Sequence, residues 1–225
     1  MGALSAMRIA QYGLGEVQLV DIAKGLARGK ALDLEDARSI LNYDYNIKGS
    51  DDISCIKDSD IVVITAGLAR KPGMTREELL AKNAQILKDV CLSIKDLAPH
   101  SIVIVVTNPL DLMTYFALKT TGFSRDKVFG MGISLDASRF TNLIAQELKL
   151  PVTHIDALVI GAHGEGMLPL SKQTNIKGVS LEEFLDSVKI ESLVKRTGAR
   201  GAEIVSFLCS GSAFFAPSAA VAQMV

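Results

Sequence analysis

The sequence predicts an α/β fold with a doubly wound parallel sheet in its first half and an α+β domain in its second. Short runs rich in Val and Ile stand at residues 16–21, 60–65 and 101–107. Because these runs do not alternate with polar residues, they are typical of strands buried on both faces. A long amphipathic segment separates the last two runs, and strand–helix–strand is the unit from which such sheets are built.

The helix between the second and third runs has a clear start and end. It begins at Thr75-Arg-Glu-Glu78, a capping box in which the Thr hydroxyl and the Glu carboxylate satisfy unpaired amides. Apolar residues then recur every three to four residues, with one gap, as far as Leu97. Pro99 lies just beyond, so we expect the helix to end near Leu97.

The second half has a different order of elements. A second capping box, Ser180-Leu-Glu-Glu183, predicts a short helix. The other expected elements are a strand at 127–129, a helix from Asp136 to near Leu150, a strand at 154–160, and helices at 201–207 and 219–225. We therefore divide the chain into domains at 1–131 and 132–225.

Composition excludes several classes of protein. Lys and Arg number 24 and Asp and Glu 25, so the net charge is −1, without the basic excess of a nucleic-acid binder. No apolar run reaches about 18 residues, and no signal sequence opens the chain, so we expect a cytoplasmic protein without a membrane partner. The three cysteines form no Cys-x-x-Cys or Cys/His cluster, so we predict no metal site.

Asp21 is the first candidate for a cofactor contact. An acidic residue that ends a strand of a doubly wound sheet commonly accepts a hydrogen bond from the ribose of NAD, although many such residues only cap a turn. Asp21 lies 19 residues after Gly2, close to the roughly 20 expected after a phosphate-binding glycine motif. Gly2 would then be the last glycine of that motif.

Polar residues also follow the second and third apolar runs. Arg70 and Arg76 flank a Pro-Gly loop after Thr65-Ala-Gly67, and Asn108 precedes a proline after the third run. Taken alone, the arginines fit a solvated surface and the asparagine fits a turn. However, ligands in open α/β sheets bind beyond the carboxyl ends of strands, and arginine binds carboxylates with two parallel hydrogen bonds.

The second half offers an acid, an arginine and a histidine. Asp136 and Arg139 are three residues apart and share one helical face, which also fits an ordinary surface ion pair. His163 stands at a strand end between glycines, unlike His100 and His154, which we expect to be structural or exposed. A histidine beside a carboxylate would be a general acid/base near neutral pH.

Taken together, these segments resemble the lactate/malate dehydrogenase family, and most closely its malate dehydrogenases of the lactate-dehydrogenase-like group. The resemblance runs through essentially the whole chain. The matching segments, in order, are 19–22, 29–34, 65–67, 70–76, 82–86, 106–109, 135–140, 161–164 and 211–217.

The resemblance implies a role for each candidate. His163 matches the family's catalytic acid/base and Asp136 its orienting partner. Arg139 matches the arginine that holds the substrate's C1 carboxylate. Arg76 matches the loop arginine that polarises the reacting carbonyl, and Asn108 an amide that contacts substrate and nicotinamide.

The resemblance also implies the cofactor and the substrate. Arg70 matches the discriminating position, where malate enzymes carry arginine and lactate enzymes usually glutamine, so we expect malate and oxaloacetate as substrates. The positions that match NAD contacts are Gly2, Asp21, Thr65, Ala66, Gly67, Asn83, Val106, Thr107 and Asn108.

The expected protein is thus an NAD-dependent malate dehydrogenase of the tricarboxylic acid cycle that forms dimers or tetramers. A lactate-type or broad 2-hydroxyacid dehydrogenase and a non-catalytic fragment are the alternatives. Against the family pattern, we expect a chain truncated at both ends. The Rossmann-type sheet would lack its first strand and first two motif glycines, and the α+β substrate domain would be incomplete.

Overall fold

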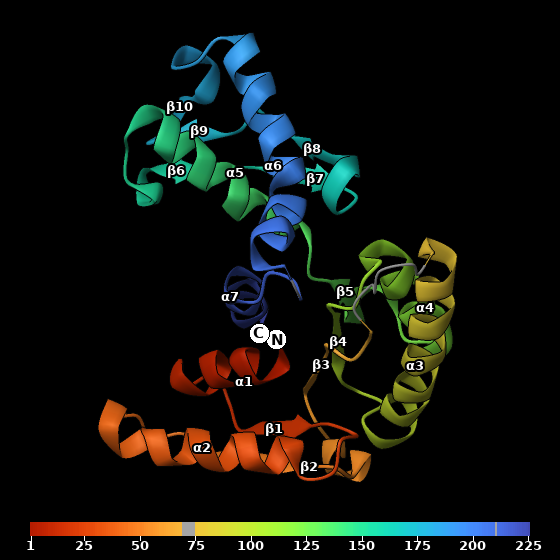
Figure 1. Cartoon of the computed structure of the whole chain (residues 1–225). Coiled ribbons are helices and arrows are strands. Elements are labelled where there is room, and N and C mark those ends of the chain that lie inside the picture. Colours follow the sequence, from red (N-terminus) through yellow and green to blue (C-terminus); the bar gives the residue numbers. More distant parts are fainter. Residues whose placement is uncertain (69–74, 210) are drawn as a thin grey trace. The chain divides into compact units, whose positions relative to one another are not determined.

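The computed structural model describes residues 1–68, 75–209 and 211–225. The chain forms two compact units (Figure 1). The first unit comprises residues 1–131 together with 214–225, and the second comprises residues 132–213.

The strands of the first unit are all parallel. β1 (Val17–Val20) pairs with β2 (Ile47–Ser50), and β3 (Ile61–Ile64), β4 (Ile102–Val105) and β5 (Val128–Gly130) form a second ladder in that order. No ladder joins β1 to β3 among the described residues. This arrangement confirms the predicted doubly wound parallel sheet that lacks one strand.

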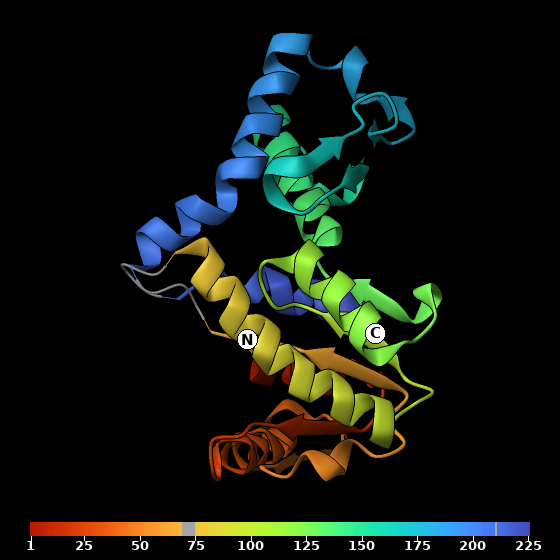
Figure 2. The same cartoon turned by 90° about the vertical axis from the view of Figure 1, so that its right-hand side faces the viewer.

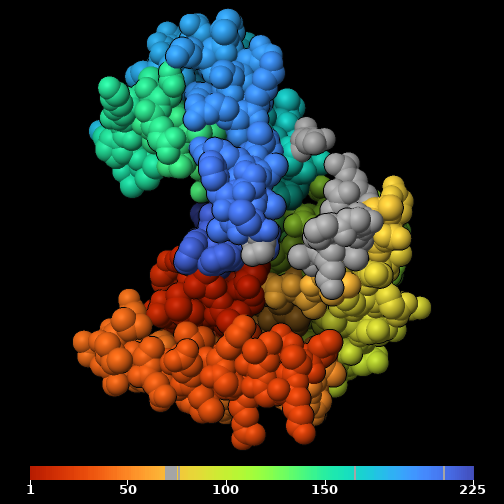
Figure 3. Space-filling view, in the orientation of Figure 1, coloured from red at the N-terminus to blue at the C-terminus, as the bar shows by residue number. Residues whose placement is uncertain are grey.

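Helices cover both faces of the β3–β4–β5 ladder. α3 (Arg76–Leu97) and α4 (Leu110–Thr121) pack against each other on one face, while α1 (Gly2–Gln11) and α7 (Phe215–Met224) lie on the other (Figures 1 and 2). α2 (Leu26–Leu41) runs along the surface next to β1 and β2 (Figure 3). The core between ladder and helices is built from buried aliphatic side chains, among them Ile64, Leu87, Val103, Val105 and Met113.

The predicted capping box opens α3. Thr75 Oγ1 accepts a hydrogen bond of 3.1 Å from the Glu78 amide, and Glu78 Oε2 accepts one of 3.1 Å from the Thr75 amide. The helix ends at Leu97, as its apolar spacing predicts. These two bonds satisfy amides that the first turn of a helix otherwise leaves unpaired.

The C-terminal helix α7 belongs to the first compact unit, although the predicted division into 1–131 and 132–225 places it in the second domain. Its small side chains, Ser218 and Ala222 among them, are buried, and it packs on α1. Arg8 Nε of α1 donates a 3.0 Å hydrogen bond to Ser218 Oγ. Side-chain packing, rather than order along the chain, therefore decides where α7 lies.

The second unit has the predicted α+β character. α5 (Ile133–Leu148) and α6 (Ser187–Leu208) pack together over two small antiparallel sheets. The sheets are β7 (Val159–Gly161) with β8 (Met167–Pro169), and β6 (Ile155–Asp156) with β9 (Asn175–Ile176) and β10 (Val179–Ser180). The core includes Phe140, Leu143, Ile144, Leu181 and Leu193.

Two predictions for this unit were wrong in detail. The strand expected at 154–160 is divided into β6 and β7, because the Leu158 amide donates to Thr174 Oγ1 instead of to a ladder. Ser180 opens only a 3₁₀ turn, in which its hydroxyl accepts from the Glu182 amide at 3.3 Å. The long helix starts later, where Asp186 caps the Lys189 amide of α6 at 2.8 Å.

Candidate active site

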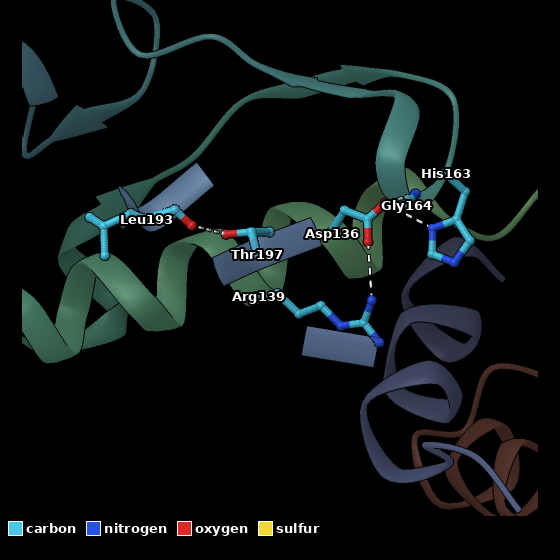
Figure 4. Close-up of polar contacts among 6 residues, drawn as sticks. All are labelled: Asp136, Arg139, His163, Gly164, Leu193 and Thr197. Carbon is cyan, nitrogen blue, oxygen red and sulfur yellow. Dashed lines mark hydrogen bonds and ion pairs between the residues drawn. The ribbon is translucent and has the colours of Figure 1, made fainter. Parts of the chain in front are cut away.

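The carboxylate of Asp136 is the centre of a buried polar cluster in the second unit (Figure 4). Asp136 lies in the first turn of α5 and is 0% exposed. Its Oδ2 accepts hydrogen bonds from His163 Nδ1 at 2.8 Å and from the Gly164 amide at 3.2 Å, and its Oδ1 pairs with Arg139 at 3.2 Å. A buried carboxylate persists only with such partners, and the start of a helix favours its negative charge.

His163 follows β7, in the connection to β8. A side chain at Gly161 is excluded there, since its Cβ would lie 2.7 Å from the Gly166 carbonyl oxygen. Gly164 has a φ of +84°, which favours glycine. These glycines let the backbone fold tightly enough to aim the imidazole at α5.

The Asp136 contact determines the protonation pattern of His163. A carboxylate accepts but does not donate, so the neutral imidazole carries its proton on Nδ1. Nε2 lies on the side of the ring away from Asp136 (Figure 4). With 21% of its side chain exposed, His163 can exchange a proton with a ligand through Nε2, while Asp136 stabilises the imidazolium that results.

Arg139 lies between Asp136 and α6. It comes one turn after Asp136 on α5, which accounts for the ion pair on one helical face. A Cβ at Gly201 of α6 would lie 3.7 Å from both Nη1 and Nη2, so glycine leaves space beside the guanidinium. Since Asp136 uses only one side of Arg139, the rest of its fork of donors suits a ligand carboxylate. Nearby Thr197, also buried, donates to the Leu193 carbonyl within its own helix.

The first unit brings together residues that follow β3 and β4. Because these strands are parallel neighbours, Thr65-Ala-Gly67 and Val106-Thr-Asn108 leave the sheet at the same edge. Thr107 Oγ1 donates to the Ala66 carbonyl at 2.6 Å, and the Asn83 side chain bonds the main chain of Leu68, directly after the first segment, and of Asn108 in the second. These predicted NAD contacts therefore form one cluster.

Gly2 and Asp21 lie at two further points of the first unit. α1 begins at Gly2, and a Cβ there would lie 2.8 Å from Thr65 Oγ1, so any side chain at this position would clash with the Thr65 hydroxyl. Asp21 directly follows β1, and its Oδ1 accepts from the Ala23 amide at 2.9 Å. Helix N-termini attract phosphate groups, so Gly2 and the amides behind it fit a dinucleotide.

Not every candidate can be placed. Arg70 lies outside the described residues, and Arg76 is the first residue of α3. In the described ranges 1–68, 75–209 and 211–225, no group of His, Cys, Asp or Glu could hold a metal ion. Within the same ranges, no helix is long and apolar enough to cross a bilayer.

Sequence reasoning missed two contributors to the Asp136 cluster. The Gly164 amide donates to Asp136, and Gly201 lies against Arg139. The first could have been found from the Gly-Ala-His-Gly pattern, because glycines on either side of a functional residue often indicate a tight turn. No sequence signal connects Gly201 with a residue 62 positions earlier.

Comparison with known proteins gives a consistent match along the chain. Residues 1–130 match the lactate/malate dehydrogenase NAD-binding domain, and residues 133–225 match the alpha/beta C-terminal domain of the same enzymes. The malate dehydrogenase of Methanosarcina barkeri is 51% identical over 224 residues, which are 100% of this chain and 73% of that protein.

Solved structures agree. Apo malate dehydrogenase from Picrophilus torridus superimposes with a TM-score of 0.95 at 43% identity, over 100% of this chain and 71% of that one. The lactate dehydrogenase of Cryptosporidium parvum, solved with lactic acid and nicotinamide adenine dinucleotide, superimposes with a TM-score of 0.93 at 36% identity, over 99% of this chain and 72% of that one.

Proposed function

The chain belongs to the lactate/malate dehydrogenase family, and we propose that it catalyses the reversible oxidation of (S)-malate to oxaloacetate with NAD. The observation that carries the proposal is the buried Asp136 carboxylate held between His163 and Arg139. One cluster thus supplies a proton-transfer group and a carboxylate-binding group on neighbouring elements, as a 2-hydroxy acid requires.

His163 and Asp136 would move the proton. In the oxidative direction, neutral His163 takes the hydroxyl proton of malate at Nε2. Bound NAD would supply the hydride acceptor. Asp136, 2.8 Å from Nδ1, stabilises the positive charge that develops on the imidazole. In the reverse direction the imidazolium returns its proton to the carbonyl oxygen of oxaloacetate.

Three arginines and an amide would bind the substrate. Arg139 holds the C1 carboxylate, for which the space beside Gly201 leaves room. By the family motif, Arg76 stabilises the negative charge on the reacting oxygen and Asn108 orients the substrate. Arg70 would pair with the second carboxylate, which pyruvate lacks.

Residues 1–131 would hold the cofactor and residues 132–225 would contribute the substrate cluster. The close approach of Gly2 to Thr65 supports a pyrophosphate site at the start of α1. Asp21 would accept the ribose hydroxyls of NAD and repel the extra phosphate of NADP. The residues proposed to line the nicotinamide half are Thr65, Ala66, Gly67, Val106, Thr107 and Asn108.

We further propose a cytoplasmic homo-oligomer. Large apolar side chains remain exposed on α6, with Val188 at 75% and Phe207 at 80% exposure, and on α2, with Ile40 at 81%. Apolar groups at these positions suit contact with further copies of the chain.

NADH oxidation by the purified chain tests the function directly. We expect turnover on oxaloacetate to exceed turnover on pyruvate by at least tenfold in kcat/KM. A preference for pyruvate would favour lactate-type activity, which the likeness to a lactate dehydrogenase keeps as the second candidate. Absence of turnover on both, with the chain folded, would contradict the proposal.

A further inference from the structure

Asn83 is buried in α3, and among the described residues its side-chain amide bonds only main-chain groups. It is 1% exposed. Its Nδ2 donates to the carbonyl oxygens of Asn108 at 2.8 Å and Leu68 at 3.3 Å, and its Oδ1 accepts from the Leu68 amide at 2.8 Å. Both amide hydrogens are used, and burial prevents a ligand from reaching the remaining lone pair of Oδ1.

The segments that Asn83 joins are packed too closely to shift independently. A Cβ at Gly67 would lie 2.7 Å from Thr107 Cγ2 and 3.4 Å from Asn83 Oδ1. Thr107 Oγ1 also donates to the Ala66 carbonyl at 2.6 Å. Asn83 therefore connects one helix to two loops, those after β3 and β4, within a fully bonded polar cluster.

We propose that Asn83 is a positioning residue that acts through the peptides of Leu68 and Asn108 without touching the cofactor. The resemblance implied a direct NAD contact at Asn83, and its burial and hydrogen bonds argue for this indirect role. The inference rests on the proposed function, in which Asn108 contacts substrate and residues 65–67 contact NAD. Groups held in place before a ligand arrives need no reordering during the reaction.

Two substitutions separate the parts of this role. Asn83→Leu has similar volume but leaves the Leu68 amide and the Asn108 carbonyl without their partner. Asn83→Asp keeps an acceptor for the Leu68 amide but directs an oxygen at two carbonyls. Gln85→Leu is the matched control, because Gln85 is exposed on the same helix and its amide donates to Asp89.

Hydrogen exchange of the Leu68 amide in the ligand-free chain is the first readout. We expect exchange at least tenfold faster in Asn83→Leu, near wild-type exchange in Asn83→Asp, and no change in Gln85→Leu. Unchanged Leu68 exchange in Asn83→Leu would overturn the proposal. This measurement needs no turnover, so it decides on the anchoring even if the chain proves inactive on oxaloacetate and the proposed function fails.

Kinetics below the melting temperature give the second readout. We expect both Asn83 variants to lose at least tenfold in kcat with oxaloacetate, while the Kd for NADH changes less than threefold. A purely structural role would lower Tm and leave kcat unchanged, and a direct cofactor contact would weaken NADH binding alone; either result would overturn the proposal. If Asn83→Leu does not fold, Asn83→Asp carries this test.

Discussion

Replacement of Asp136 by asparagine is expected to lower kcat for malate oxidation by two to three orders of magnitude. The carboxylate oxygen lies 2.8 Å from His163 Nδ1, and for such a contact Coulomb's law is applied at a charge separation of about 4 Å. At an effective dielectric constant of about 20, the carboxylate stabilises the imidazolium by about 4 kcal/mol. At about 1.4 kcal/mol per factor of ten, removal of this stabilisation would slow the reaction by about three orders of magnitude if the proton is fully transferred to His163 in the transition state.

The amide also changes the tautomer. When its nitrogen points at His163, it donates to Nδ1 and moves the imidazole proton to Nε2, where the ring can no longer take a proton from malate. When its oxygen points at His163, its nitrogen faces the Arg139 guanidinium, which is also a donor. Either orientation disrupts one of the two functions of the cluster.

The assay is steady-state NAD reduction with malate, together with Tm and the Kd for NADH. Glu147→Gln is the matched control, because Glu147 lies on the same helix and pairs with Lys189 at 2.8 Å on the surface. We expect this control to keep kcat within twofold. A folded Asp136→Asn variant with kcat within threefold of wild type would refute the account of the cluster.

Three further predictions concern substrate specificity, the space beside Arg139 and the reactivity of the cysteine thiols. Arg70→Gln should lower kcat/KM for oxaloacetate and raise it for pyruvate, so that the ratio of the two values falls by about two to three orders of magnitude, because an enclosed unpaired arginine costs about 3–5 kcal/mol. An unchanged ratio would contradict the assignment. Gly201→Ala, whose Cβ would lie 3.7 Å from the Arg139 guanidinium, should leave KM for oxaloacetate within threefold of wild type, while Gly201→Leu should raise KM at least tenfold. Equal KM values in the two variants would argue against binding of the substrate carboxylate beside Arg139. Exposed Cys209 should react with a thiol reagent in the native chain, whereas Cys91, whose pKa burial raises to about 11, should react only on unfolding; equal rates by mass spectrometry would contradict this.

The parallel strands could be predicted because their environment is uniform. Residues 61–64 are buried or half-buried and residues 103–105 are buried, so their aliphatic composition alone indicates strands. The start of α3 was equally predictable, because a capping box is complete within four residues. Local chemistry determines these elements, and the sequence displays local chemistry directly.

Features decided by distant partners could not be predicted. Thr174 divides the strand at 154–160, and packing on α1 places α7 in the first unit. The same limit applies to the site. The pairing of Asp136 with His163 could be inferred from chemistry, but the main-chain bonds of Asn83 depend on loops 15 and 25 residues away.

The His163→Asn variant tests the central claim most directly, with kcat on oxaloacetate and the Kd for NADH measured on the same preparation. Asparagine can still hydrogen-bond Asp136 but cannot exchange a proton near neutral pH. The account predicts a loss in kcat of at least about 10²-fold, with NADH binding within twofold of wild type. A folded variant that keeps near-normal kcat would contradict it.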